Sequence, residues 1–240
     1  MIILMRKRTL IGAALLTMGL VILTGFLLRL DKRSVTVSTG VMAAAEGSVL
    51  IWDAGHGGAD GGAVSAAGVP ESGINLSVAK KCCQLSRFFG CRALLSRTDN
   101  GSLADVDANS IRRQKVSDTK NRVALVNGVD NALLFSIHQN SLPDSPKTHG
   151  AMVFFNGKKP AAEIADTVQT ALNKAVNTDN EKHCRSISSD IYLMAHVNHP
   201  AVLVECGFMS NPAEAERLLE NTYQNQLACA ITGGYLQYKG

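Results

Sequence analysis

Four side chains spread along this 240-residue chain have the chemistry needed for metal-assisted hydrolysis. His56, Glu71 and His138 offer two imidazoles and a carboxylate, the donors of a zinc site that leaves a fourth position open. Glu205 is a second carboxylate that could take up a proton beside the metal and pass it on. Their separations in sequence are long, and a random His and Glu are more often surface or core residues. The fold must therefore decide whether the four meet.

The elements around these residues indicate an α/β fold. Residues 48–53 form a short apolar run that predicts a buried strand, and a Gly-rich loop over 54–62 follows it. A helix is expected over 72–89, with Gly90 as its stop. Its apolar face comprises Ile74, Val78, Cys82, Leu85 and Phe89.

Strands that alternate with helices predict a twisted, mostly parallel sheet flanked by helices. The strand runs are apolar throughout, which is typical of a sheet covered on both faces. A polar stretch over 98–117 precedes a helix that Ser117 or Asp118 would cap. Further strands are expected at 91–96, 132–138, 151–155 and 201–205, and further helices at 118–127, 161–177, 212–221 and 224–235.

The four candidate residues fall where this fold would bring them together. His56 follows the first strand, His138 ends the third, and Glu205 ends the strand over 201–205. Glu71 opens the helix after the His56 loop. Ligands of such sheets bind beyond the carboxyl ends of the strands, so one edge of the sheet is the expected site.

Two other kinds of chemistry fit the sequence less well. The Gly-rich loop lacks the G-K-[ST] ending of a phosphate-binding P-loop, and its glycines more simply let backbone approach a metal site. Cys206 is next to Glu205, but a thiol nucleophile needs a paired histidine, and the sequence marks none for it. We interpret Cys206 as a packed thiol.

Several neighbouring residues keep two interpretations. Asp53 either orients a ligand histidine or caps the loop, and Asn140 either bonds substrate or caps a turn. The stretch over 98–117 is either a lip for substrate or a solvated connection. His149 lacks a motif but lies near the His138 loop.

Several local motifs narrow the choice: Asp53–Ala63 with Glu71 and Ile74–Leu76, Arg97–Asp99, Arg122–Asn127, Ser136–Asn140 and Pro200–Asn211. Together they resemble a known family, the zinc-dependent N-acetylmuramoyl-L-alanine amidases (amidase type 3). That resemblance implies that His56, Glu71 and His138 hold one Zn²⁺ per chain and that Glu205 is the catalytic acid/base. It also implies peptidoglycan as the substrate and hydrolysis of the amide between N-acetylmuramic acid and L-alanine.

Within the family, the segment 110–123 and the V-E-C-G-F wording resemble the spore-cortex amidases of the CwlD type. That resemblance implies a role in cortex maturation that leads to muramic-δ-lactam. The short stretch 141–148 leaves no room for the regulatory helix of division-associated relatives, so control through a partner protein is expected. Alternatives are a non-catalytic or partner-activated peptidoglycan-binding protein, and a zinc peptidase that cuts within the stem peptide.

The N-terminal region predicts a membrane anchor. Thr9–Leu28 carries no charge and has about the 20 apolar residues that a membrane-spanning helix needs. The A-x-A-like run over 43–45 is well downstream, which disfavours a cleaved signal peptide. The expected organisation is a cytoplasmic tip and anchor over 1–33, a linker over 34–47 and a catalytic domain over 48–240 on the extracytoplasmic side. In a sporulating cell this domain would face the cortex space.

Charge and cysteine content limit the remaining function classes. Residues 1–33 hold six Lys/Arg and one Asp, which leaves 18 basic against 19 acidic residues in 34–240. A near-neutral domain is not the basic surface that nucleic acid requires, so no nucleic-acid partner is expected. The six cysteines include no C-x-x-C pair, and a domain this large does not need disulfides. We therefore expect free thiols rather than disulfides.

Overall fold

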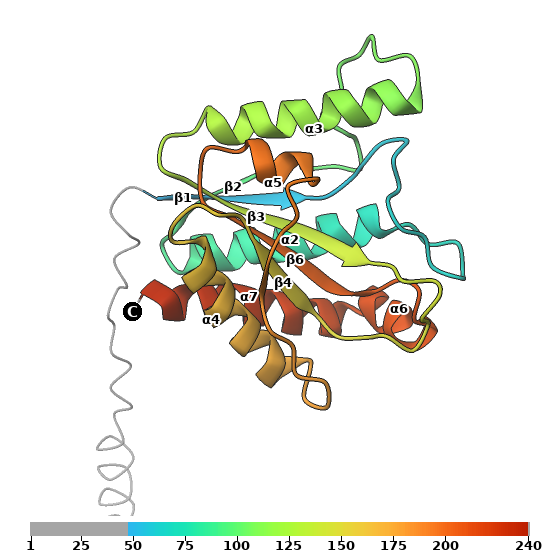
Figure 1. The fold of residues 1–240 in the computed structure, drawn as a ribbon, viewed down its shortest axis with the longest axis vertical. Coiled ribbons are helices and arrows are strands. Elements are labelled where there is room, and N and C mark those ends of the chain that lie inside the picture. Colours follow the sequence, from blue (N-terminus) through green and yellow to red (C-terminus); the bar gives the residue numbers. More distant parts are fainter. Residues whose placement is uncertain (1–47, 240) are drawn as a thin grey trace, which may run out of the picture. The chain divides into compact units, whose positions relative to one another are not determined.

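The computed structural model describes residues 48–239, and these form an α/β domain around one six-stranded sheet (Figure 1). The strand order is β2-β1-β3-β6-β4-β5. Neighbouring strands are parallel except for β4, which runs antiparallel to β6. The strands are β1 (Val49–Ala54), β2 (Arg92–Leu95), β3 (Ala132–Asn140), β4 (Met152–Phe155), β5 (Arg185–Ser186) and β6 (Ala201–Phe208). The mostly parallel sheet predicted from the sequence is confirmed.

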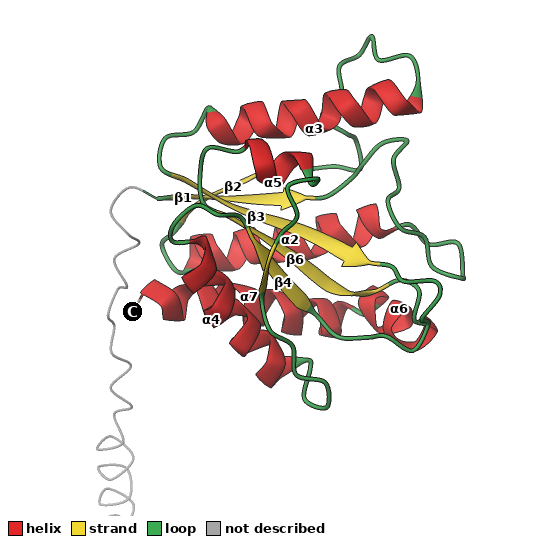
Figure 2. Cartoon of the chain, viewed as in Figure 1, coloured by secondary structure: helices red, strands yellow, loops and turns green. Residues whose placement is uncertain are grey.

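Helices cover both faces of this sheet (Figure 2). Figure 1 shows α3 and α5 on one side and α2, α4 and α7 on the other. The helices are α2 (Glu71–Phe88), α3 (Ile111–Asn127), α4 (Ala161–Ala175), α5 (Tyr192–His196), α6 (Pro212–Leu219) and α7 (Asn221–Lys239). None of the helices within residues 48–239 is long and apolar enough to cross a membrane. The predicted anchor over Thr9–Leu28 lies outside the described residues.

The core explains why the strands are apolar on both faces. Leu50 and Trp52 of β1 pack into the larger cluster on the α2 side, whereas Ile51 packs into a smaller cluster with residues of α3 and α5. All six residues of β1 are buried. Trp52 stacks on Phe135 of β3 with ring centroids 4.5 Å apart. Because alternate side chains enter two different cores, a shift of register by one residue would misplace both sets.

Some boundaries differ from the sequence prediction. Helix α3 begins at Ile111, where Ser110 accepts a hydrogen bond from the Arg113 amide, and not at the predicted Ser117 or Asp118. The start was missed because α3 has no apolar stripe: its buried residues are Asp118, Arg122 and Val126. Strands β3 and β6 also extend beyond the predicted ends at 138 and 205, and the short β5 and α5 were not predicted.

The end of α2 also departs from the prediction. Gly90 follows the helix with a φ of +79°, as expected of a glycine that ends a helix. Phe89, which was placed on the apolar face, is instead half exposed because the helix ends at Phe88. The other members of that predicted face are buried or packed against the core.

Candidate metal centre

The structure brings His56, Glu71 and His138 together beyond the carboxyl end of β1. One ligand atom from each lies within 4.8 Å of the others. The Nε2 atom of His56 is 3.2 Å from Glu71 Oε1, and Nδ1 of His138 is 3.7 Å from Glu71 Oε2. His56 lies in the loop after β1, Glu71 is the first residue of α2, and His138 is in β3. The predicted convergence of three chain segments is therefore present.

Glu205 lies on β6, directly beside His138. The two residues are partners in the parallel register of β3 and β6, so their side chains leave the same face of the sheet. Among the described residues, Glu205 Oε2 is buried and has no hydrogen-bond partner. Burial raises the pKa of Glu205 to about 7, while nearby His138 lowers it and Glu71 raises it further. A carboxyl group with this pKa can both accept and donate a proton near neutral pH.

These residues line a cleft of about 420 Å³ between the sheet edge and the helices α3 and α5. His56, His138 and Glu205 line it together with Asp53 and Leu203. Its lining also includes Lys115, Asp118, Thr119 and Arg122 of α3 and residues 190–193 at α5. The cleft thus opens His56, His138 and Glu205 to solvent, whereas Glu71 is not among its lining residues.

His56 is held by a carboxylate and an unusual backbone conformation. Its φ is +59°, a left-handed conformation that non-glycine residues rarely adopt. Its Nδ1 lies 2.9 Å from Asp60 Oδ2, and Asp60 Oδ1 lies 2.8 Å from Lys115 Nζ. Burial lowers the pKa of His56, but Glu71 and Asp60 outweigh burial and raise it to about 9. Nδ1 is therefore occupied by Asp60, which leaves Nε2 to face Glu71.

Glu71 is fixed by hydrogen bonds to both oxygens. Its Oε1 accepts the Ala63 amide at 2.8 Å, and Oε2 accepts the Gln139 amide at 2.7 Å and Asn75 Nδ2 at 2.9 Å. Burial raises the pKa of Glu71, but bonds to His138 and His56 bring it well below its usual range. This carboxylate stays charged and oriented, as a metal ligand must.

Comparisons with known proteins agree with this geometry. A family profile described as N-acetylmuramoyl-L-alanine amidase matches residues 49–237. The germination-specific N-acetylmuramoyl-L-alanine amidase of Bacillus subtilis is 35% identical over 193 residues, which are 80% of this chain and 80% of that protein. The chain belongs to the N-acetylmuramoyl-L-alanine amidase family. The sequence-based prediction of an amidase of this family is confirmed.

Solved structures of other amidases share the fold. The CwlD amidase from Clostridioides difficile, solved in complex with the GerS lipoprotein, matches with a TM-score of 0.75 and 33% identity over 80% of this chain and 98% of that one. The amidase AmiC2 of Nostoc punctiforme matches with a TM-score of 0.68 and 27% identity over 81% of this chain and 98% of that one. The predicted similarity to the CwlD type is confirmed by the first of these.

Two arginines of the amidase bind the main chain of the Gly-rich loop over 54–62, which carries His56 and is called the metal loop below. Arg97 donates to the carbonyls of Ala54 at 2.9 Å and of Gly55 at 3.1 Å. Arg122 of α3 donates to the carbonyls of Ala54 at 2.8 Å and of His56 at 2.7 Å. Both residues occur in the motifs that resemble the family, but their contacts were not predictable from the sequence. Their contacts explain how the loop keeps its strained turn.

Asp53 does not orient either histidine in the amidase. It forms an ion pair with Arg122, and its Oδ2 accepts the Ser136 hydroxyl at 2.7 Å. Burial raises the pKa of Asp53, but Arg122, Ser96 and Ser136 bring it below its usual range. The interpretation of Asp53 as the residue that orients a ligand histidine is wrong, since Asp60 has that contact. Asp60 was identifiable as the carboxylate four residues after His56.

Two glycines make room for the donors. A Cβ atom on Gly55 would lie 2.2 Å from the His138 ring, so no larger residue fits there without moving this histidine. Gly62 has a φ of +71°, and its Cβ would lie 2.4 Å from Glu71 Oε1. The Gly-rich loop therefore serves close approach to the candidate ligands, as the sequence suggested.

The remaining candidates have structural surroundings. Asn140 Oδ1 accepts the Ser141 amide at 2.8 Å, which is the turn-capping alternative. His149 does not line the cleft.

Burial raises the pKa of the Cys206 thiol well above its usual range, which disfavours a thiolate nucleophile. All six cysteines are free, as expected. The polar stretch over 98–117 fits each of its two interpretations in part. Lys115 lines the cleft, as a lip for substrate would, whereas Leu103 and Asp105 form hydrogen bonds to α3, as a connection would.

Proposed function

We propose that this chain is a zinc-dependent hydrolase of the amide bond between N-acetylmuramic acid and L-alanine in peptidoglycan. The position of Glu205 beside the candidate metal ligands is the observation that carries the proposal. It lies beside the three clustered donors, and one of its oxygens has no partner within residues 48–239. A buried carboxyl group with a free oxygen in a cleft is suited to move a proton rather than to stabilise the fold.

The donor set fits zinc. Two imidazoles and one carboxylate, with ligand atoms within 4.8 Å of one another, match the three protein ligands of catalytic zinc sites. His56, Glu71 and His138 would hold the ion, and Asp60 would fix the tautomer of His56. When bound, zinc supplies Lewis-acid polarisation of a carbonyl and a lowered pKa for water.

The chain's own residues would then perform the proton transfers. Glu205 accepts a proton from the water that attacks the lactyl carbonyl carbon. As the C–N bond breaks, Glu205 delivers this proton to the departing nitrogen of L-alanine. The products are a free lactyl carboxylate and a free amino group on the stem peptide. Glu71 keeps its charge throughout because His56 and His138 hold its pKa low.

The cellular role that we propose is maturation of the spore cortex. The germination-specific amidase of Bacillus subtilis supports this role, and so does the CwlD similarity. Removal of the stem peptide would prepare muramic acid for deacetylation and formation of muramic-δ-lactam. We also propose that Thr9–Leu28 anchors the chain, with residues 34–47 as a linker and residues 48–240 as an extracytoplasmic catalytic domain facing the cortex space.

An activating partner protein is part of the proposal. The CwlD amidase from Clostridioides difficile was solved in complex with the GerS lipoprotein. In this chain, residues 141–151 connect β3 to β4 without a helix that could act as an internal regulator. The second candidate function is a peptidoglycan-binding protein that hydrolyses its ligand only after a partner completes the metal site.

The deciding experiment measures zinc in the purified chain, alone, beside two histidine variants. We expect about one zinc per chain in the wild type and in His183→Ala, which changes an exposed residue, and a large loss in His138→Ala. A well-folded wild type with little zinc would point to the partner-dependent alternative. Zinc retained by His138→Ala would exclude the proposed site.

Product analysis distinguishes the proposed reaction from peptide cleavage. Hydrolysis of muropeptides by the zinc-loaded chain should release an intact stem peptide with a new amino group on L-alanine. A shortened stem peptide that remains attached to muramic acid would instead identify a peptidase.

A further inference from the structure

Two adjacent aromatic residues protrude at the end of α2. Phe88 is 81% exposed and Phe89 is 50% exposed, and their rings are edge-to-face with centroids 5.2 Å apart. The corner that carries them is held by main-chain hydrogen bonds from Gly90 to Arg87 at 3.0 Å and from Cys91 to Ser86 at 2.9 Å. Contiguous exposed apolar surface marks contact sites in many proteins, so this pair is a candidate contact surface.

The aromatic pair lies at the end of the domain opposite the metal centre. Strands β1, β2, β3 and β6 are parallel and begin at this end, which we call the leading end, at Val49, Arg92, Ala132 and Ala201. Phe88 and Phe89 come just before the start of β2. The metal donors follow the other end of β1, whose six residues span about 20 Å at roughly 3.3 Å each.

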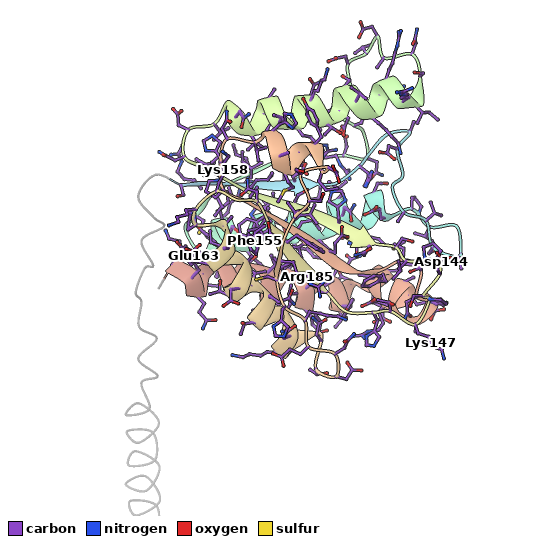
Figure 3. All side chains as sticks on the ribbon, in the orientation of Figure 1. Asp144, Lys147, Phe155, Lys158, Glu163 and Arg185 are labelled. Atoms are coloured by element: carbon purple, nitrogen blue, oxygen red, sulfur yellow. The ribbon has the colours of Figure 1, made fainter. Side chains whose placement is uncertain are left out.

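Basic side chains accompany the aromatic pair at the leading end. Arg92 begins β2 and is exposed, and Lys158 and Lys159 are exposed in the loop that follows β4. That loop is at the same end because Asn156 pairs with Ala201, the first residue of β6. Figure 3 shows Lys158 there together with Glu163, while Asp144 and Lys147 lie at the far end. Exposed acidic residues at this end include Asp130, just before β3, and Glu163, near the start of α4.

The chain enters the domain at this same end. Residue 48 directly precedes β1, and only 19 residues, 29–47, separate it from the uncharged apolar segment Thr9–Leu28. With Thr9–Leu28 as the proposed membrane anchor, 19 residues can reach at most roughly 65 Å, which limits the distance of the domain from the membrane but not its orientation. A second contact on the domain would be needed to fix it.

We propose that the leading end docks on the lipid bilayer through Phe88 and Phe89, with Arg92, Lys158 and Lys159 facing anionic headgroups. This inference rests on the proposed membrane anchor. Aromatic side chains favour the membrane interface, and basic residues are attracted to anionic lipid surfaces. Docking by this end orients the metal centre away from the bilayer and toward the wall. This surface would thus orient the catalytic domain toward the peptidoglycan layer, which is its proposed substrate.

The test uses fluorescence quenching by lipid in vesicles that contain the full chain. The chain has a single tryptophan, Trp52, which is fully buried, so wild-type emission can be subtracted as background. The variant Phe88→Trp places a reporter in the aromatic pair at an exposed position that tolerates the change. The control Val106→Trp places the same reporter at a fully exposed position in the loop before α3. The vesicles contain phosphatidylcholine and phosphatidylglycerol, with and without bromine near the headgroup.

Brominated lipid should quench Phe88→Trp several times more strongly than Val106→Trp. Charge reversal by Lys158→Glu with Lys159→Glu should reduce that quenching. Flotation of the vesicles in a density gradient shows whether the chain is bound to them. If the chain floats but both reporters are quenched equally and weakly, the proposed docking surface is wrong. A chain that does not float would overturn the anchor and the docking surface together. Zinc content measured on the same sample reports on the proposed hydrolase independently.

Discussion

Glu71 and Glu205 are two carboxylates near the same pair of histidines, and their surroundings differ in almost every other respect. Glu71 begins a helix and accepts hydrogen bonds from Ala63, Asn75 and Gln139. Glu205 lies within a strand and has one oxygen without a partner in the described part of the chain. The pKa of Glu71 is well below its usual range, whereas burial raises that of Glu205 to about 7.

This difference shows how one type of side chain can take two roles in a single site. A carboxylate with saturated hydrogen bonds keeps its charge and position, which suits ligation. A carboxyl group without such bonds can change its protonation state at little structural cost, which suits proton transfer. The different roles of Glu71 and Glu205 depend on contacts from segments that are distant in sequence. Each substitution or condition below tests one part of this difference.

The largest expected effect is on turnover in Glu205→Gln. Loss of the proton-transferring group should reduce kcat by about 10²- to 10⁴-fold, while zinc content stays at the wild-type level. Muropeptide hydrolysis followed by chromatography measures the first quantity, and elemental analysis measures the second. Glu216→Gln, an exposed substitution on α6, is the matched control and should retain full activity. Near wild-type turnover in Glu205→Gln would remove Glu205 from the mechanism.

Glu71→Gln should show the opposite pattern, with metal affinity affected first. Replacement of an outer hydrogen-bond partner of a ligand typically costs about 10- to 100-fold in affinity, so loss of the charged ligand should exceed about 100-fold. Competition against a chromophoric chelator measures this affinity. If Glu71→Gln retains zinc and Glu205→Gln loses it, the two roles are reversed.

A smaller loss is expected when the negative charge of Asp60 beside His56 is removed. Asp60→Asn should weaken zinc binding by about 10- to 100-fold. Lys115→Met should weaken it less, because Lys115 contacts Asp60 rather than a ligand and its side chain is 52% exposed. The same competition assay gives both values. A stronger effect of Lys115→Met than of Asp60→Asn would mean that Lys115 acts on the site by another route.

The smallest effect is a dependence on pH that follows from His56. In the metal-free chain, the pKa of His56 is raised from 6.5 to about 9, so its charged form stabilises the fold fully below pH 6.5 and loses this effect as pH rises through about 9. Zinc needs the neutral imidazole, so binding should release a proton and strengthen by up to about tenfold per pH unit below that pKa. Calorimetry at pH 7 in buffers of different ionisation enthalpy measures this release. Binding without proton release would contradict the His56 assignment.

The sequence predicted the parts of this site that depend on local pattern. Apolar runs marked the strands that carry His138 and Glu205, and the chemistry of four residues at the ends of elements suggested a common edge. The contacts that distinguish Glu71 from Glu205 were not predictable in this way. Gln139 donates to Glu71 through its main chain, and a backbone amide leaves no signal in a sequence.

Helix α3 shows a second limit of pattern reasoning. Its two buried charged residues are Asp118 and Arg122. Arg122 donates to the main chain of the metal loop, and Asp118 accepts from Arg122 and from the Leu103 amide. A helix whose inward side is charged has no apolar periodicity, so its first two turns were interpreted as part of a polar stretch. Lys115, which lies in those turns, was missed as a contact of Asp60 for the same reason.

The position of β6 has a consequence for when the enzyme can become active. This strand lies between β3 and β4 in the sheet, although among the described residues it is the last strand to be synthesised. A nascent chain that ends before residue 201 exposes the apolar edge of β3 and lacks Glu205 altogether. With Glu205 in the proton-transferring role proposed above, a chain that ends before residue 201 lacks the group needed for hydrolysis, so activity begins only after β6 has been synthesised.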